Sequence, residues 1–186
     1  MTTSPPSASD SSASRAFELL HPALQRWIHE QGWSVLRDAQ ERAVAPILSG
    51  DQDVIISAAT AAGKTEAAFL PIVSALATAR DTDPGAPADP WTAHDPWAEP
   101  APATHPGIEV LYLSPLKALI NDQYDRLEQL CDRAGVPVHR WHGDVAASAK
   151  KRARTKPEGV LLITPESLEA QFVNRGHEVP AMLAGL

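Results

Sequence analysis

The stretch that decides the fold is "DVIISAATAAGKTEAAF", residues 53–69. A short run of β-branched apolar residues leads through small residues into Gly-Lys-Thr, and an alanine-rich helical pattern follows. This order predicts a strand over 53–57, a loop, and a helix from Lys64 to about Arg80. In such a unit the loop N–H groups and the amino terminus of the helix surround phosphates, so the stretch indicates a phosphate-binding site.

The polar residues of this loop have distinct expected roles. Lysine reaches the outer phosphates and the adjacent hydroxyl coordinates Mg²⁺ through the nucleotide, so Lys64 and Thr65 are the candidate catalytic residues. One short helix upstream, the amide of Gln40 can read the N6 and N7 edge of adenine, although a lone glutamine is usually solvated. A structural turn is the alternative for the loop. The candidate nucleotide-binding residues are Gln40, Ala58, Ala59, Thr60, Ala61, Ala62, Gly63, Lys64 and Thr65.

Position 58 departs from the strict loop pattern, which has glycine there. Alanine fits at that position when its φ is negative, because the methyl group then meets no backbone atom. The substitution therefore leaves the phosphate-loop interpretation open rather than excluding it.

The bulk composition is that of a soluble protein with one domain of ordinary size. The chain has 186 residues, of which 44% are apolar and 21% charged, and a net charge of −7. The single cysteine, Cys131, excludes an internal disulfide and fits a cytoplasmic location. No run approaches the roughly 20 apolar residues of a membrane span. The negative charge argues against a protein that holds nucleic acid by charge alone.

Apolar runs and helical patterns alternate along most of the chain. Residues 1–14 are typical of a disordered tail, and a partial domain is expected over 15–186. Pro22 is expected to separate two short helices, and Gly50 to close another. The pattern predicts an α/β domain with a parallel sheet covered on both sides. Further strands are expected over 108–114, 136–141 and 159–164, and further helices over 116–135, 146–154 and 166–176.

One segment, residues 81–107, interrupts this alternation. It is crowded with prolines and is not expected to form regular structure. A solvated insertion without a role is the favoured interpretation, and a functional loop is the alternative.

The dipeptides Ser114-Pro115 and Thr164-Pro165 each follow an expected strand. Serine or threonine suits an N-cap and proline suits the first helical position, so each dipeptide is expected to open a helix. Ligands of open parallel sheets gather at the carboxyl ends of strands. Helix amino termini and hydroxyls at that edge can hold phosphates without a large positive charge.

The ordered motifs resemble those of the first RecA-like domain of a superfamily-two DEAD/DEAH-box helicase, in the Lhr-like and Ski-like branch. Gln40 with Trp33 is similar to the Q motif and "AATAAGKT" to motif I. "SPLKALIND" resembles motif Ia, "HGD" at 142–144 the small motif after the third strand, and "TPESLEA" motif Ib. The resemblance runs from about Trp33 to Asn174, with the proline-rich segment as the exception.

The resemblance implies a parallel-sheet, RecA-like P-loop NTPase domain that uses ATP and Mg²⁺. It further implies contacts with the backbone of single-stranded DNA or RNA and with a second RecA-like domain in the same or an adjacent chain. The nucleic-acid residues that it implies are Ser114, Pro115, Leu116, Lys117, Gly143, Asp144, Thr164, Pro165, Glu166 and Ser167. The basic run 150–156 either flanks that path or forms a solvated helix face.

Hydrolysis in this family needs an Asp-Glu pair after motif Ib, and the sequence contains no Asp-Glu dipeptide. The chain is thus expected to be the amino-terminal part of a larger helicase, truncated before that motif. Alone, it is expected to bind nucleotide weakly without efficient hydrolysis or unwinding. The alternatives are a non-catalytic nucleotide- or nucleic-acid-binding fragment and another P-loop enzyme such as a small-molecule kinase.

Overall fold

The computed structural model describes residues 15–60, 62–82 and 107–186. They form two compact units, one ending at Thr78 and the other running from Ala79 to Leu186. The expected tail and residues 83–106 of the proline-rich segment lie outside the described residues. Within the described parts, no helix has both the length and the apolar character needed to cross a membrane.

The first unit is built from helices. Residues 15–18 are helical, and α2 begins afresh at Pro22, which confirms the separation expected there. Gly50, at φ 68°, ends α3 in the left-handed conformation that glycine tolerates best, as expected. The helices are α2 Pro22–Glu30, α3 Asp38–Ser49 and α4 Lys64–Asp81, whose last residues belong to the second unit.

The strand expected over 53–57 is wrong. These residues form no regular structure, and the side chain of Ile55 is 93% exposed. A strand is stable only when its N–H and C=O groups pair with a neighbouring strand. The described residues of the first unit include no strand that could pair with this segment. The β-branched composition that predicted a strand is therefore not sufficient to form one.

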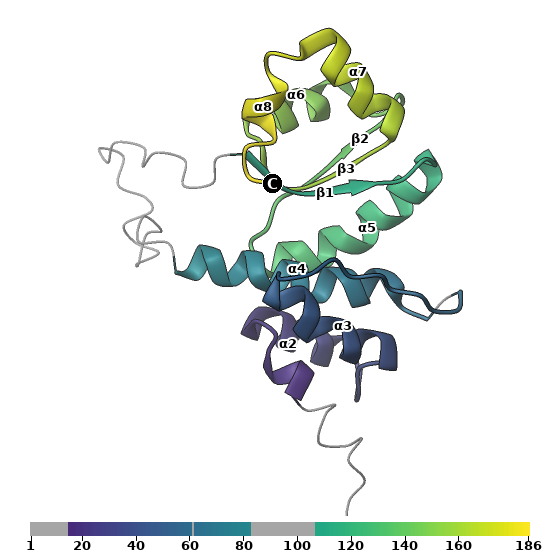
Figure 1. Ribbon diagram of the computed structural model, residues 1–186, viewed down its shortest axis with the longest axis vertical. Coiled ribbons are helices and arrows are strands. Elements are labelled where there is room, and N and C mark those ends of the chain that lie inside the picture. Colours follow the sequence, from purple (N-terminus) through teal and green to yellow (C-terminus); the bar gives the residue numbers. More distant parts are fainter. Residues whose placement is uncertain (1–14, 61, 83–106) are drawn as a thin grey trace, which may run out of the picture. The chain divides into compact units, whose positions relative to one another are not determined.

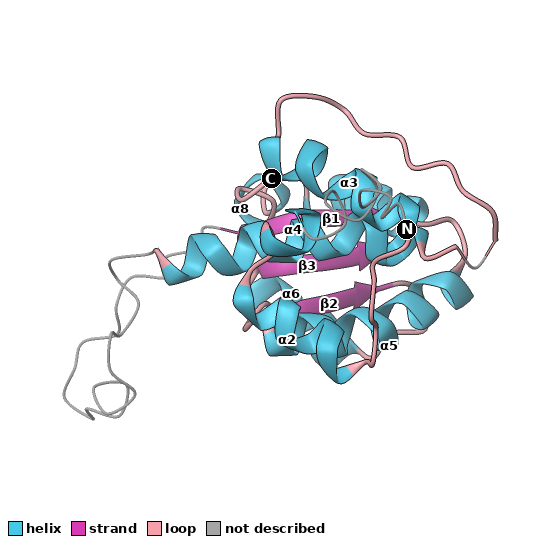
Figure 2. Cartoon of the chain, turned by 90° about the horizontal axis from the view of Figure 1, so that it is seen from below, coloured by secondary structure: helices cyan, strands magenta, loops and turns pink. Residues whose placement is uncertain are grey.

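The second unit contains a parallel sheet of three strands in the order β1-β3-β2 (Figure 2). The strands are β1 Gly107–Leu113, β2 Val138–Trp141 and β3 Glu158–Ile163. Both edge strands pair with the central strand in parallel, which confirms the expected strand direction. The last strand in the sequence thus lies between the other two.

Helices cover both faces of this sheet (Figure 1). On one face lies α5 Lys117–Arg133. The other face carries α6 Ala147–Thr155, α7 Pro165–Arg175 and α8 Val179–Met182. The short α8 has no counterpart among the expected elements. The α/β parallel-sheet class predicted from the sequence is confirmed.

Apolar side chains fill the space between sheet and helices. On the face of α6 and α8, one cluster joins strand residues with Ala153 and Met182. On α5, Ile120, Leu127 and Leu130 are buried. Leu116 and Leu119 are instead 58% and 43% exposed. Leu116 precedes the first helical residue, so it does not share the buried face.

A mostly buried ion pair joins the two sides of the proline-rich segment. Arg80, at the end of α4, pairs with Glu109 of β1, and their side chains are 14% and 12% exposed. The same carboxylate oxygen of Glu109 accepts a hydrogen bond from the Gly159 N–H at 2.8 Å. Glu109 therefore connects the end of α4 to the start of β3 as well as to its own strand.

Candidate functional site

The Gly-Lys-Thr loop lies at the amino terminus of α4, as the sequence predicts. Gly63 has φ 79°, and the helix begins at the next residue, Lys64. The Lys64 Nζ donates hydrogen bonds to the carbonyl oxygens of Ala58 and Ala59 at 2.7 and 2.9 Å. The Lys64 side chain thus connects the end of the loop to its first residues. Ala61, another candidate residue, lies outside the described residues.

Gln40 packs against this loop. Its side chain is only 2% exposed, so the alternative of a solvated glutamine is wrong. The Gln40 Oε1 accepts a hydrogen bond from the Arg37 N–H at 2.9 Å, which stabilises the start of α3. A Cβ added at Gly63 would lie 2.6 Å from the Gln40 Nε2. Glycine at 63 is therefore favoured by its positive φ, and a side chain there would also require the Gln40 amide to move.

The loop and the start of α4 carry a hydroxyl that suits Mg²⁺ and an ammonium and N–H groups that suit phosphates. The Lys64 side chain is exposed, and Thr65 is half-buried in the first turn of α4. The amino terminus of an 18-residue helix adds N–H groups and the positive end of its dipole. This donor set matches a phosphate site in the loop and helix, although the preceding segment is not a strand.

In the second unit, three candidate segments emerge at one edge of the sheet. Ser114, His142 and Thr164 directly follow β1, β2 and β3. The Ser114 N–H donates to the Ile163 carbonyl, and the Thr164 N–H donates to the Trp141 carbonyl, each at 3.3 Å. These bonds align the three strand ends. We call the residues 114–117, 142–144 and 164–167 the rim, and the structure confirms that they share the carboxyl edge of the sheet.

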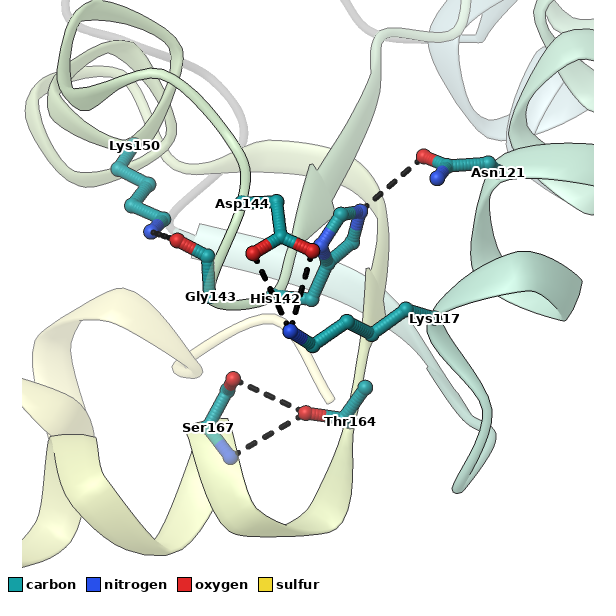
Figure 3. Close-up of polar contacts among 8 residues, drawn as sticks. All are labelled: Lys117, Asn121, His142, Gly143, Asp144, Lys150, Thr164 and Ser167. Carbon is teal, nitrogen blue, oxygen red and sulfur yellow. Dashed lines mark hydrogen bonds and ion pairs between the residues drawn. The ribbon is translucent and has the colours of Figure 1, made fainter.

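The two proline dipeptides of the rim differ. Thr164 is the N-cap of α7, because its Oγ1 accepts from the Ser167 N–H at 3.4 Å and lies 2.9 Å from the Ser167 Oγ (Figure 3). Ser114 does not cap a helix, and that expectation is wrong. Leu116, at φ −109° and ψ 120°, is still extended, so α5 begins only at Lys117.

The centre of the rim is an ion pair between helix and loop (Figure 3). The Lys117 Nζ lies 3.2 and 3.0 Å from the two carboxylate oxygens of Asp144. A Cβ added at Gly143 would lie 3.3 Å from that Nζ, so the absence of a side chain at 143 leaves room for the Lys117 ammonium. The Lys150 Nζ donates to the Gly143 carbonyl at 3.1 Å. Two ammonium groups therefore converge on the segment that follows β2.

Charge and burial set the protonation states at the rim. The hydrogen bond and the charge of Lys117 hold the pKa of Asp144 below its usual value. Burial lowers the pKa of His142, whose side chain is 3% exposed. Asp144 is therefore ionised and His142 neutral at pH 7, so the rim carries the charge of Lys117 beside the carboxylates of Asp144 and Glu166, with the Lys150 ammonium reaching it from α6.

The remaining predicted rim residues are mostly accessible. Ser114 and Thr164 are buried, and Ser167 is half-buried. The exposed members are Pro115, Leu116, Lys117, Gly143, Asp144, Pro165 and Glu166. Exposed backbone and side-chain groups at a helix amino terminus are suited to contact a phosphate backbone.

The basic run 150–156 does not form one stripe. Lys150 reaches the rim, whereas Lys156 pairs with Glu158 at 2.9 Å, at the opposite end of β3. One member of the run therefore reaches the rim, while Lys151 is exposed.

Sequence reasoning missed Asn121. Its Oδ1 lies 3.1 Å from both the Arg140 Nη1 and the His142 Nε2. The signal was present, because Asn121 follows Lys117 by four residues and therefore lies on the same face of α5.

Comparison with known proteins identifies the family. Residues 37–182 match the model of DEAD/DEAH box helicases. The chain is 30% identical over 166 residues to the ATP-dependent helicase Lhr-Core of Methanothermobacter thermautotrophicus, an overlap of 83% of this chain and 17% of that protein. It is 32% identical over 152 residues to the Lhr helicase/probable uracil glycosylase of Mycolicibacterium smegmatis, 75% of this chain and 9% of the relative. The chain thus spans less than a fifth of the length of these relatives.

Solved structures agree with this assignment. The helicase Lhr of Mycobacterium smegmatis bound to single-stranded DNA and AMP-PNP superposes with a TM-score of 0.63 at 25% identity, over 90% of this chain and 20% of that one. Mss116p bound to single-stranded RNA and AMP-PNP has a TM-score of 0.66 at 18% identity, over 94% and 32%, and shares the RecA-like fold. The interpretation as a small-molecule kinase is therefore wrong, and the chain belongs to the DEAD/DEAH box helicase family.

Proposed function

We propose that this chain is the ATP-binding and nucleic-acid-binding part of an ATP-dependent DNA or RNA helicase. The observation that carries the proposal is the position of Gly63, Lys64 and Thr65 at the start of α4, within residues 37–182 that match the family. Two relatives support it by name, one as an ATP-dependent helicase and one as a helicase bound to single-stranded DNA and AMP-PNP.

In the nucleotide part of this proposal, Lys64 exchanges its bonds to Ala58 and Ala59 for the outer phosphates of ATP. Thr65 contributes a hydroxyl ligand to Mg²⁺, and Gln40 recognises adenine from its place beside the loop. Bound Mg²⁺ neutralises phosphate charge, which is its usual contribution to phosphoryl chemistry. The absence of an Asp-Glu dipeptide from the 186 residues leads us to expect binding without efficient hydrolysis.

In the nucleic-acid part, the rim holds the phosphate backbone of a single strand. Lys117 supplies the charge, and the exposed start of α7 supplies N–H groups. The other RecA-like domain would come from the same or an adjacent chain, and a cytoplasmic location fits the single free cysteine, Cys131. A non-catalytic binding module is the second candidate, because these 186 residues carry the loop and the rim without an Asp-Glu dipeptide.

The nucleotide part is tested by titrating the purified chain with a fluorescent ATP analogue and Mg²⁺. Lys64→Ala is expected to weaken binding at least 10-fold, since it removes a charge-assisted phosphate contact. Lys151→Ala is the matched control, because Lys151 is an exposed lysine on α6. Circular dichroism should be the same for all three proteins. Wild-type affinity in Lys64→Ala would refute the assignment of the loop.

The nucleic-acid part is tested with fluorescein-labelled single strands of DNA and RNA at several salt concentrations. Lys117→Ala should weaken binding uniformly across sequences and reduce the salt slope by about 1. Lys156→Ala, at the opposite end of β3, should change neither quantity. Equal effects of the two substitutions would show that the rim is not the binding surface.

A further inference from the structure

Asn121 connects three elements behind the rim. It lies one turn after Lys117 on α5, and both side chains point toward the segment that follows β2 (Figure 3). The Asn121 Oδ1 is 3.1 Å from the Arg140 Nη1 on β2 and 3.1 Å from the His142 Nε2 just beyond it. One amide oxygen thus contacts the side chains of both Arg140 and His142.

The chemistry of these groups determines which atom carries each proton. A guanidinium can only donate, so the Asn121 atom that faces Arg140 is the carbonyl oxygen. That oxygen can only accept, and the His142 Nε2 beside it must therefore be an N–H. In the neutral imidazole the Nδ1 is then an acceptor, and it is buried without a hydrogen-bond partner among the described residues.

We propose that Asn121 is a positioning residue of the rim, which holds His142 as the Nε2–H tautomer and thereby fixes Gly143 and Asp144 against Lys117. The expected effect on binding rests on the proposed nucleic-acid function. The effect on the His142 tautomer follows from the contacts of Asn121 alone. In this proposal Asn121 acts through the segment that follows β2.

The connection between Asn121 and the Gly143-Asp144 part of the rim runs through a single residue, His142. His142 is the residue directly before Gly143, whose carbonyl and Cα lie between Lys150 and Lys117. Rotation of the imidazole away from Asn121 would carry the backbone of this segment with it, because the His142 side chain is buried and protein interiors are close-packed. Asp144 would then lose the position in which both of its oxygens reach Lys117.

Besides the neutral Asn121 amide, four charged groups influence the protonation of the His142 imidazole. Asp144 favours its protonation, whereas Lys117 on α5, Arg140 on β2 and Lys150 on α6 oppose it. Protonation would occur at the Nδ1, since the Nε2 already carries its hydrogen. The bond to Asn121 is therefore compatible with both charge states, and its loss should alter the tautomer at neutral pH.

The experiment reads the tautomer directly by ¹⁵N NMR of histidine side chains in the full chain. The His142 signals are assigned by their absence from His142→Gln, because the chain has seven histidines. Wild type should show a protonated Nε2 and an unprotonated Nδ1 at pH 7. Asn121→Ala should give a mixture of tautomers, whereas Asn174→Ala, which changes the other asparagine of the chain, should leave the signals unchanged.

Asn121→Asp separates positioning from general stability. The carboxylate keeps an acceptor of the same shape, so the Nε2–H tautomer should persist, and its added charge should raise the pKa of His142 in an NMR titration. Binding to single-stranded DNA should weaken about 3- to 10-fold in Asn121→Ala, the equivalent of one or two hydrogen bonds. The Asn174→Ala control should bind as wild type does.

Several results would overturn the inference. An unprotonated Nε2 in wild type, or an unchanged tautomer in Asn121→Ala, would show that Asn121 does not select the state of His142. A mixed tautomer together with wild-type DNA affinity would show that the rim does not depend on it. If wild type itself binds no single strand, the proposed function fails, while the NMR result still decides the role of Asn121.

Discussion

The ammonium of Lys117 lies 3.0 Å from the nearer carboxylate oxygen of Asp144, across the connection between helix α5 and the end of β2. Both side chains are well exposed, at 53% and 73%. Exposed ion pairs contribute little to stability, so this pair matters more for what can bind at Lys117. In the proposed function, a phosphate must compete with Asp144 for the lysine.

Asp144→Asn should therefore strengthen the binding of single-stranded DNA. The substitution releases Lys117 and removes a negative charge that faces the phosphates, and an increase of about 3- to 10-fold is expected at low salt. Fluorescence anisotropy with a labelled strand measures the change. Asp132→Asn, near the opposite end of α5, changes the net charge equally and serves as the control. Identical gains in the two variants would mean that only net charge matters.

Gln40→Ala should weaken the binding of ATP more than that of GTP. The amide is proposed to pair with the N6 and N7 edge of adenine, which guanine does not present. A loss of about 5-fold or more for ATP, measured by competition with a fluorescent analogue, is expected for one removed polar contact. Gln40 also stabilises the start of α3 through the Arg37 N–H, so thermal unfolding of the variant must be recorded. An equal loss for both nucleotides would contradict base recognition.

Gly159→Ala should destabilise the second unit far more than Gly135→Ala. Both glycines have positive φ, 70° and 63°, and this alone costs about 1–2 kcal/mol for alanine. A Cβ at Gly159 would also collide with the Pro137 carbonyl, whereas nothing lies within 4 Å at Gly135. Urea unfolding should show a total loss of about 2–5 kcal/mol for Gly159→Ala. Similar losses in the two variants would contradict the described approach of β3 to Pro137.

The Cys131 thiol should resist modification while the second unit is folded. Burial raises its pKa from 9.0 to about 12. In pH 8 buffer, labelling by a thiol reagent should therefore proceed only through opening of the structure and accelerate with urea. Rapid labelling of the folded protein, at the rate of a free thiol, would contradict the buried position.

The same thiol makes a prediction for alkaline stability. Between about pH 9 and 12 the thiol of the unfolded chain ionises while that of the folded chain stays protonated, so folding is progressively disfavoured. The free energy of unfolding should fall by up to about 1.4 kcal/mol per pH unit in this window. Cys131→Ala should lack this component, and equal slopes in the two proteins would refute it.

The second unit could largely be predicted from the sequence. Its strands are continuous apolar runs followed by helical patterns, and local pattern and final fold agree there. The position of Thr164 as an N-cap followed from one residue and its neighbouring proline. Ser114 had the same signature and does not cap, because Leu116 is still extended and the helix begins two residues later, at Lys117, which a dipeptide does not reveal.

The segment over 53–57 shows where local pattern fails. Its composition favours a strand, but strand formation depends on pairing with residues distant in sequence, which composition does not encode. Asn121 was missed for a related reason. Its spacing from Lys117 places it on the right face of α5, but its role arises from Arg140 and His142, some twenty residues further along the chain, and the local sequence does not identify these partners.

The order β1-β3-β2 has a consequence for synthesis of the protein. The central strand ends at Ile163, so β1 and β2 emerge from the ribosome before the only strand of the described sheet with which either pairs. During that interval the nascent chain exposes apolar segments that helices alone cannot cover. Neither edge strand can therefore form its sheet hydrogen bonds until β3 has left the exit tunnel.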